Sequence, residues 1–336
     1  MSKVSVVMPS YNSEKYISYA LNSLINQTFY DWECIIVDDA STDKTLEIIK
    51  EYSKKEPRIK YKTFETNTGS AKVPRDTAIN MSTSDWIIFL DSDDLFELDV
   101  IEKLVLRQIE TNADIVMLKI AQIDENGVIN QNKFNNRYKY FDFSNILTGK
   151  EAVKLTIGEW IIGGFGLFNR KILANRKIIE NIFHNFNIDE YDTRQMIVSA
   201  KNIAFIDTNY YLRFNSASIT RTFNIKKFQV LFTNDLIKKL IEDNFNKNDN
   251  IHNKMKYQYI CGIIDCRKLL LENKNKIEKD KLIELEQLIK YYYIKFKNYK
   301  YNIWSFPFIK KILFAYNYTI FKLTTFILYN NKNKGN

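Results

Sequence analysis

Three carboxylates lie within four residues in the segment Asp91-Ser92-Asp93-Asp94. They follow residues 86–90, a continuous apolar run that predicts a buried strand. Like charges this close repel one another unless a cation neutralises them. Mg²⁺ and Mn²⁺ prefer oxygen ligands, often one or two carboxylates together with substrate phosphates. The segment therefore predicts a metal site for a phosphorylated substrate, although a D-x-D alone is more often a solvated turn that caps a helix.

Strand and helix signals alternate through the first half of the chain. Apolar runs predict strands over residues 4–8, 32–37, 59–64, 86–90 and 114–120. Helical spacing follows most of them, with Ser13 as the expected N-cap of the first helix and Thr42 or Asp43 of the second. Asn126-Gly127 predicts a hairpin. This order is typical of an α/β fold, a mainly parallel sheet flanked by helices.

Polar clusters follow three of the expected strands, at residues 9–12, 38–43 and 91–94. Parallel sheets bind ligands beyond the carboxyl ends of their strands. We therefore expect the three clusters to meet at one edge of the sheet and to form the site there.

Four motifs in order carry a family resemblance: VSVVMPSYN at 4–12, IIVDDASTDKT at 35–45, TNTGSAKVPRDTAIN at 66–80 and DWIIFLDSDD at 85–94. Together they resemble the N-terminal half of the family 2 glycosyltransferases, inverting enzymes with the nucleotide-binding, Rossmann-like GT-A fold. The resemblance implies a GT-A catalytic domain over residues 1–221. Residues 1–120 would bind the nucleotide-sugar and residues 121–221 the acceptor. A basic helical region, 222–336, would follow.

The resemblance also implies roles for single residues. A nucleotide-sugar, most commonly a UDP-sugar, would bind with Mn²⁺ or Mg²⁺ as cofactor. Asp91 would face the donor and the metal, Asp93 would bind the metal, and Asp94 would approach the sugar or the acceptor. The remaining donor contacts would come from Pro9 and Tyr11 beside the base, Asp38 on the base edge, Asp39 with Ser41 in the supporting turn, and Lys72 and Arg75 near the phosphates.

Sugar transfer with inversion needs a carboxylate that accepts the proton of the acceptor hydroxyl. The family places this aspartate in a Glu-Asp pair some ten residues before an Ala-Lys, and Asp189 lies at that distance from Ala200-Lys201. Ile188 stands where the family has glutamate, so Glu190 and Asp192 stay open as alternatives. All three acids could equally be residues favoured at a helix N-terminus.

A glycine-rich segment at residues 158–170 contains Trp160, which is either a platform for the acceptor sugar or a core residue. The three cysteines, Cys34, Cys261 and Cys266, have no metal-ligand or redox spacing and predict buried thiols in a reducing cytosol. The N-terminus lacks the apolar core of a signal peptide, so we expect a cytoplasmic enzyme.

Charge is unevenly distributed along the chain. Residues 1–215 contain 26 basic and 30 acidic residues, residues 216–336 contain 23 and 10, and no acid follows Glu286. Apolar residues recur at helical spacing in the tail: Phe306, Ile309, Leu313, Tyr316, Ile320, Leu323 and Ile327. Such a basic amphipathic segment favours peripheral docking on an anionic membrane surface, at the inner face of the cell membrane. The alternative is that the stripe packs on the catalytic domain.

Other functions fit less well. A sugar-1-phosphate nucleotidyltransferase needs a glycine-rich basic loop after the first strand, where this chain has Pro-Ser-Tyr-Asn. A scaffold that binds a membrane or nucleic acid would leave the ordered motifs unexplained. We therefore expect a glycosyltransferase, a hexosyl- or N-acetylhexosaminyl-transferase, acting on a glycan or lipid-linked saccharide. Bacterial surface polysaccharide synthesis is the expected pathway, and nucleic acid is not an expected partner.

Overall fold

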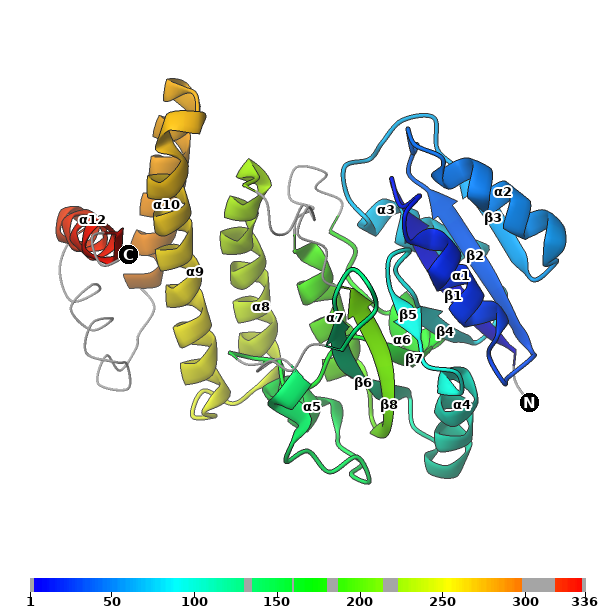
Figure 1. Cartoon of the computed structure of the whole chain (residues 1–336). Coiled ribbons are helices and arrows are strands. Elements are labelled where there is room, and N and C mark those ends of the chain that lie inside the picture. The colour runs from blue at the N-terminus through cyan, green and yellow to red at the C-terminus, as the bar shows by residue number, and fades with distance from the viewer. Residues whose placement is uncertain are drawn as a thin grey trace. The chain divides into compact units, whose positions relative to one another are not determined.

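The computed structural model describes residues 3–129, 135–158, 160–179, 187–213, 223–297 and 318–333. These residues form two compact units, Met1–Ala217 and Ser218–Asn336 (Figure 1). The domain boundary predicted from the sequence, residue 221, lies four residues later. Every residue proposed for donor binding, metal binding or proton transfer lies in the first unit.

A sheet of eight strands forms the centre of the first unit. The strand order is β3-β2-β1-β4-β7-β6-β8-β5. The strands are β1 (Val4–Ser10), β2 (Trp32–Asp38), β3 (Ile59–Thr63), β4 (Trp86–Phe89), β5 (Leu95–Phe96), β6 (Ile115–Ile123), β7 (Gly166–Asn169) and β8 (Ile203–Arg213). Strands β3, β2, β1 and β4 are parallel, as are β6 and β8, whereas β7 and β5 run antiparallel to their neighbours. The expected mainly parallel sheet is confirmed.

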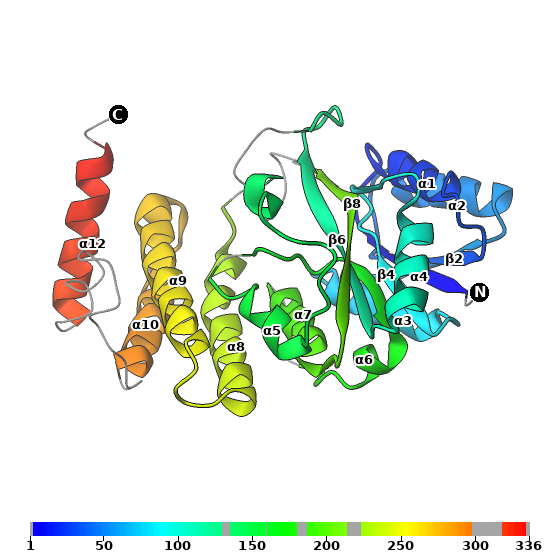
Figure 2. The ribbon, with the colours of Figure 1, turned by 90° about the horizontal axis from the view of Figure 1, so that it is seen from below.

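Helices cover both faces of this sheet, as Figure 2 shows for α1 and α2 on one side of β2 and α3 on the other. All residues of β1 and β2 are buried, which explains their continuous apolar sequence. The helices of the unit are α1 (Ile17–Ile25), α2 (Thr45–Lys55), α3 (Lys72–Met81), α4 (Val100–Thr111), α5 (Gly149–Lys154), α6 (Arg170–Ala174) and α7 (Ile188–Ser199).

The N-caps expected for the first two helices have different outcomes. Ser13 does not cap α1, because its hydroxyl lies 2.7 Å from the hydroxyl of Ser92 and joins two loops instead. At α2 the expected Asp43 does accept a hydrogen bond from the N–H of Thr45, at 2.9 Å. The hairpin at Gly127 is confirmed by an antiparallel bridge between Ile123 and Ile129.

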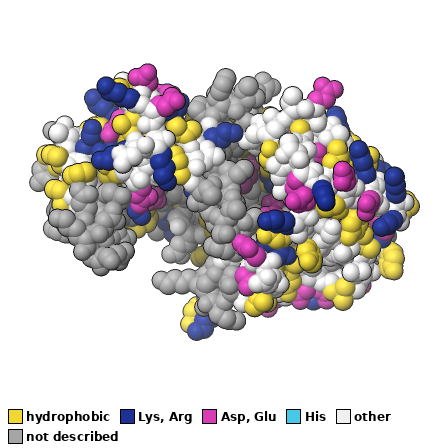
Figure 3. All heavy atoms as spheres, turned by 45° about the horizontal axis from the view of Figure 1, so that its top comes forward, with side chains coloured by type: hydrophobic (Ala, Val, Ile, Leu, Met, Phe, Trp, Pro, Cys, Tyr) yellow, Lys and Arg dark blue, Asp and Glu magenta, His cyan; other side chains and the backbone are white. Residues whose placement is uncertain are grey.

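The second unit is helical, as expected. Its helices are α8 (Val230–Asn244), α9 (Ile251–Asn273), α10 (Lys279–Lys297) and α12 (Tyr318–Asn333), and α9 packs against the other three. In the part of the chain that the structure describes, no helix is long and apolar enough to cross a membrane. On the face drawn in Figure 3, basic and acidic side chains are mixed over the described surface. Cys34 and Cys266 are buried, and all three cysteines are free thiols.

Candidate active site

The strand order has its switch point at the carboxyl ends of β1 and β4, and this edge of the sheet is called the crevice. From β1 the chain proceeds outward to β2 and β3, and then returns to β4 on the other side of β1. Open α/β sheets bind ligands at such a switch point. Hydrogen bonds tie the loops there together: the Asn12 N–H donates to Ser41 Oγ at 3.0 Å, and the hydroxyls of Ser13 and Ser92 lie 2.7 Å apart. The three polar clusters therefore meet, as the sequence predicted.

Asp38 and Asp39 organise the loop after β2. The Asp38 carboxylate is fully buried and accepts hydrogen bonds from the Ser41 N–H, the Ser41 hydroxyl and, at 2.9 Å, the Thr63 hydroxyl. Asp39 accepts from the N–H and the hydroxyl of Thr68, both at 3.0 Å. The supporting role of Asp39 and Ser41 matches this geometry, whereas the contact of Asp38 with a base edge stays a prediction.

The side chains expected beside the base differ in exposure. Pro9 lies inside buried β1, in register with Val37 of β2, so it shapes the strand end. Tyr11 follows two residues later, just after the end of β1, and its side chain is 40% exposed. An aromatic ring at this position can pack against a planar base.

The carboxylates after β4 have unlike surroundings. Asp91 and Asp93 are half-buried, whereas Asp94 is 1% exposed. The Asp94 carboxyl accepts from the Tyr210 hydroxyl at 2.7 Å and from the Arg213 N–H at 2.8 Å. Burial, followed by the charges of Asp93 and Asp91, raises the pKa of Asp94 well above its usual range. The expectation that Asp94 approaches the sugar or acceptor is wrong, because its carboxyl belongs to the core.

Asp91 and Asp93 suit a divalent cation that is shared with a substrate. Among the described residues no group of three or more histidine, cysteine, aspartate or glutamate side chains could hold a metal by itself. Two carboxylates are the number that Mg²⁺ commonly takes from protein when phosphate oxygens and waters complete its shell. The donor set therefore fits a metal that binds together with a diphosphate.

The two basic residues of α3 have different partners. Arg75 donates to Asp91 Oδ1 at 3.0 Å. Burial works against the charge of Arg75, but Asp91 and Asp189 outweigh it and raise the pKa of the guanidinium. Arg75 thus lies within electrostatic reach of both the carboxylates after β4 and the acid at the start of α7. Lys72 is buried instead, with its ammonium 2.6 Å from Asp76 Oδ2 and 3.9 Å from Asp192 Oδ2.

The three acids of α7 are separated by their surroundings. Asp189 is exposed. Glu190 pairs with Arg194 at 3.2 Å, and Asp192 is 7% exposed beside Lys72 and Arg176. Burial is the largest cause that raises the pKa of both Glu190 and Asp192. Among the three, only Asp189 presents its side chain openly to solvent, so the geometry favours it as the base.

Tyr210 and Arg213 were not predicted as site residues. The Asp91 N–H donates to the Tyr210 hydroxyl at 3.1 Å, and Arg213 Nε donates to the Asp93 carbonyl at 3.0 Å. These residues at the end of β8 therefore hold the loop that carries the carboxylates. The sequence Tyr-Tyr-x-Arg at 210–213 was the available signal, but the contact spans more than a hundred residues of chain.

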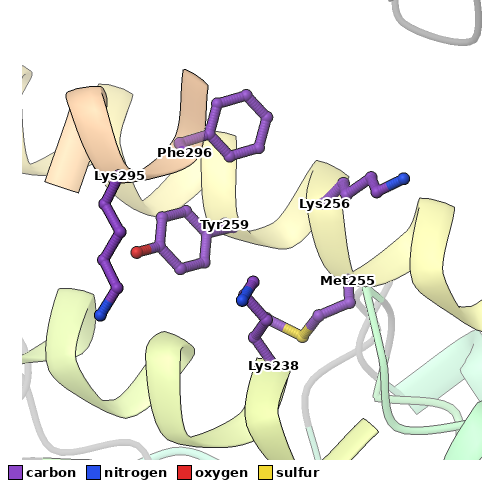
Figure 4. Close-up of a pocket in the computed structure, with 6 residues that line it drawn as sticks. All are labelled: Lys238, Met255, Lys256, Tyr259, Lys295 and Phe296. Carbon is purple, nitrogen blue, oxygen red and sulfur yellow. The ribbon is translucent and has the colours of Figure 1, made fainter. Parts of the chain in front are cut away.

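The second unit contains a small hollow lined by Lys238, Met255, Lys256, Tyr259, Lys295 and Phe296. Figure 4 shows Lys256 extending away from Tyr259. Lys295 pairs with Asp235 at 2.6 Å. No carboxylate is among the described residues that line this hollow, in contrast to the proposed metal site of the first unit.

Comparison with known proteins identifies the class of enzyme to which this fold and this arrangement of residues belong. The model of glycosyl transferase family 2 matches residues 5–175, which is more than half of the chain. The protein belongs to that family.

Relatives include TarP, a poly(ribitol-phosphate) β-N-acetylglucosaminyltransferase of Staphylococcus aureus, 28% identical over 68% of this chain and 67% of TarP. The glycosyltransferase GlyG of Streptococcus pneumoniae is 28% identical over 70% of this chain and 77% of its own length. TarS of S. aureus, another poly(ribitol-phosphate) β-N-acetylglucosaminyltransferase, is 37% identical over 38% of this chain, a match that spans 22% of TarS.

Solved structures confirm the fold. The crystal structure of S. aureus TarS residues 1–349 in complex with UDP-GlcNAc superimposes with a TM-score of 0.72 at 18% identity. The superposition covers 99% of this chain and 92% of that one. The GT-A-like architecture followed by a helical C-terminal region is therefore shared.

Proposed function

We propose that this protein is an inverting glycosyltransferase that moves a sugar from a UDP-sugar to a hydroxyl group of a bacterial surface polymer. Asp189 accepts the proton of that hydroxyl while its oxygen attacks the anomeric carbon. The bond from this carbon to the diphosphate oxygen breaks with its electron pair, and UDP leaves. Attack and departure occur on opposite faces, so the configuration inverts.

Asp91 and Asp93 would hold Mn²⁺ or Mg²⁺ in this reaction. A divalent cation bound there supplies positive charge to the diphosphate leaving group. Arg75 can add a hydrogen bond to a phosphate oxygen from its position beside Asp91. Tyr11 would contact the nucleotide base, and Asp38 would reach the base edge only if its hydrogen bonds with Ser41 and Thr63 rearrange on binding.

One observation carries the proposal: Arg75 lies 3.0 Å from Asp91 Oδ1, and the charge of Asp189 at the start of α7 also raises the pKa of its guanidinium. A donor whose phosphates contact Arg75 and the cation held by Asp93 would present its sugar toward Asp189. A nucleotidyltransferase has no need of an exposed base at that place.

The donor and the acceptor class are proposed from the relatives. TarS and TarP are named for transfer of N-acetylglucosamine to poly(ribitol phosphate), and a Bacillus relative is named for transfer of glucose to the same polymer. We therefore propose UDP-GlcNAc or UDP-glucose as donor. The proposed acceptor is a polyol-phosphate polymer or a related surface glycan, either free or lipid-linked.

A panel experiment tests this function. UDP-GlcNAc, UDP-glucose, UDP-galactose and their GDP and TDP counterparts are each incubated with Mn²⁺ and with poly(ribitol phosphate), poly(glycerol phosphate) or no acceptor. We expect metal-dependent release of UDP and labelled polymer from at least one pair. Absence of nucleotide release from every donor contradicts the proposal.

Calorimetry with UDP and Mn²⁺ tests the metal site directly. Asp93→Ala should bind UDP at least about tenfold more weakly than wild type, because a carboxylate that holds the cation is lost. Asp31→Ala, which removes an exposed acid away from the crevice, is the matched control. Equal affinity of wild type and Asp93→Ala would refute the assignment.

We further propose that α12 docks the enzyme on an anionic membrane surface. Phe321 of α12 is fully buried, with its ring centroid 4.9 Å from that of Tyr293 in α10. Leu323, Phe326 and Ile327 are 57%, 43% and 55% exposed. Two members of the predicted stripe, Leu323 and Ile327, thus face outward. The first four members, Phe306 to Tyr316, lie outside the described residues. Nine lysines after Glu286, with no acid among them, favour anionic lipid.

Liposome flotation tests the docking. The full chain should float with phosphatidylglycerol vesicles at low salt and not with phosphatidylcholine vesicles. The triple variant L323S/F326S/I327S should stay in solution. The control L106S/I109S removes exposed apolar residues from α4 in the first unit and should float like wild type. Flotation of the triple variant would exclude α12 as the docking element.

A further inference from the structure

Arg194 is a fully buried cation in the wall of the acceptor half. It lies in α7, one turn after Glu190, and its side chain is 0% exposed. Its Nη1 donates to the Glu190 carbonyl at 3.0 Å and to Glu190 Oε2 at 3.2 Å. Its Nη2 donates to the Thr156 carbonyl, just beyond α5, at 2.8 Å. A buried guanidinium is costly unless its groups are hydrogen-bonded. Both Nη atoms of Arg194 are bonded in this way, whereas its Nε has no hydrogen-bond partner among the described residues.

The same guanidinium stacks on an aromatic ring. Its central carbon lies 4.1 Å from the ring centroid of Trp160, within the range of a cation–π contact. Trp160 is half-buried, so part of the indole faces solvent while Arg194 covers one face. One side chain thereby connects the first turn of α7, the end of α5 and the glycine-rich segment.

That segment approaches α7 closely at Gly164, which has no side chain. A Cβ added at Gly164 would lie 2.8 Å from Thr193 Cγ2. Gly158 has φ +80°, a left-handed conformation that turns the chain just before Trp160. The backbone is therefore built to bring the indole against α7, and Arg194 is the side chain that holds it there.

We infer that Arg194 is a positioning residue for the acceptor: it fixes Glu190 in an ion pair and holds the indole of Trp160 beside the turn that carries Asp189. The inference rests on the proposed function. The open part of the indole offers an apolar surface to the C–H groups of a sugar or polyol, whose hydroxyl would then reach Asp189. Glu190 forms an ion pair with Arg194 and in this way helps to hold Arg194 and Trp160 in place.

Steady-state kinetics on R194M, R194K and W160L tests the inference. The assay uses the donor–acceptor pair found in the panel, beginning with UDP-GlcNAc and poly(ribitol phosphate). We expect R194M to raise the KM for the polymer about tenfold or more while the Kd for UDP with Mn²⁺ stays within about twofold. R194K keeps the charge but loses the planar stack, so its effect should be intermediate and it should fold if R194M does not.

A double-mutant cycle separates positioning from general stabilisation. If Arg194 acts through Trp160, R194M/W160L should cost no more in polymer KM than the larger single effect. Unchanged polymer KM in both arginine variants would overturn the inference, and so would a parallel loss of UDP affinity, which indicates a structural role. If the wild-type protein transfers sugar to no acceptor, both the proposed function and this inference are contradicted. If the wild type is active and the variants are equally active, only the inference is contradicted.

Discussion

At the residue scale, burial assigns different chemistry to identical side chains. Asp91 and Asp94 are three residues apart, yet one faces the crevice beside Arg75 and the other accepts hydrogen bonds within the core. In the same way Asp189 is exposed, whereas Asp192 lies among buried charges. A carboxylate can act on a substrate only from an accessible position, so Asp189 is the acid whose removal should affect the chemistry.

Asp189→Asn should slow sugar transfer by roughly a hundredfold or more, because a positioned general base commonly contributes that much. UDP affinity should stay close to that of wild type, since Asp189 belongs to the proposed acceptor side of the site. Transfer rates with saturating donor, compared with UDP binding by calorimetry, give both quantities. Full activity in this variant would move the base to another group.

Glu33 is a second residue whose surroundings make a measurable prediction. Its side chain is 2% exposed in β2. Burial opposes its charge, but hydrogen bonds from Thr83, Lys60 and Ser5 prevail and lower the pKa of Glu33 from 4.5 to about 2. A carboxyl whose pKa is lowered by folding stabilises the native state above its unfolded pKa, and this contribution disappears as the pH falls toward the folded pKa.

Glu33→Gln should therefore reduce the free energy of unfolding at pH 7 by about 3 kcal/mol. The difference from wild type should shrink between pH 4.5 and pH 2. Denaturant unfolding at pH 7, 5 and 3 measures it, with Glu65→Gln, an exposed acid, as control. A difference that is constant with pH would contradict the linkage.

At the element scale, α5 and α7 approach through a glycine. The Gly149 N–H donates to the Ala200 carbonyl at 3.1 Å. A Cβ at Gly149 would lie 2.2 Å from the Ile197 carbonyl oxygen and 2.6 Å from that of Ala200. These backbone oxygens lie at the C-terminal end of α7, the helix that carries Asp189. The packing of α5 against α7 therefore affects the position of Asp189.

Gly149→Ala should destabilise the protein by about 1–3 kcal/mol, because overpacking forces a backbone shift. Transfer activity should fall with it, as α7 moves. Gly127→Ala is the comparison: its Cβ would meet nothing within 4 Å, and its φ of +86° should cost only about 1–2 kcal/mol with activity retained. Thermal melting and transfer assays on both variants distinguish overpacking between α5 and α7 from a purely local backbone cost. A Gly149→Ala variant as stable and active as wild type would show that α5 and α7 can move apart without cost.

At the scale of the whole molecule, the two units carry different proposed tasks. The crevice and Asp189 lie in Met1–Ala217, and the exposed apolar residues of α12 lie in Ser218–Asn336. UDP with Mn²⁺ should therefore slow hydrogen exchange in the loops after β1, β2 and β4 and leave α8, α9 and α10 unchanged. Exchange measured by mass spectrometry with and without UDP tests this division. Strong protection confined to the second unit would place the nucleotide elsewhere.

Local pattern was sufficient to predict much of this protein. The alternation of apolar runs and helical spacing predicted β1, β2, β3, β4 and β6, and the mainly parallel sheet followed from their order. The Asp91–Asp94 cluster could be located at the edge of that sheet because polar residues directly follow a buried strand. These properties depend on neighbours within a few residues, which is why sequence reveals them.

Only the tertiary structure decided which carboxylates are accessible. Asp94 is buried by Tyr210 and Arg213, and Asp192 by Lys72 and Arg176. It also decided that Ser13 joins two loops instead of capping α1, and that Arg194 covers Trp160. The pairing of Asp94 with Tyr210 and Arg213 joins segments more than a hundred residues apart. Whether a charged side chain faces solvent depends on such distant partners, and the spacing of residues along the chain carries no record of them.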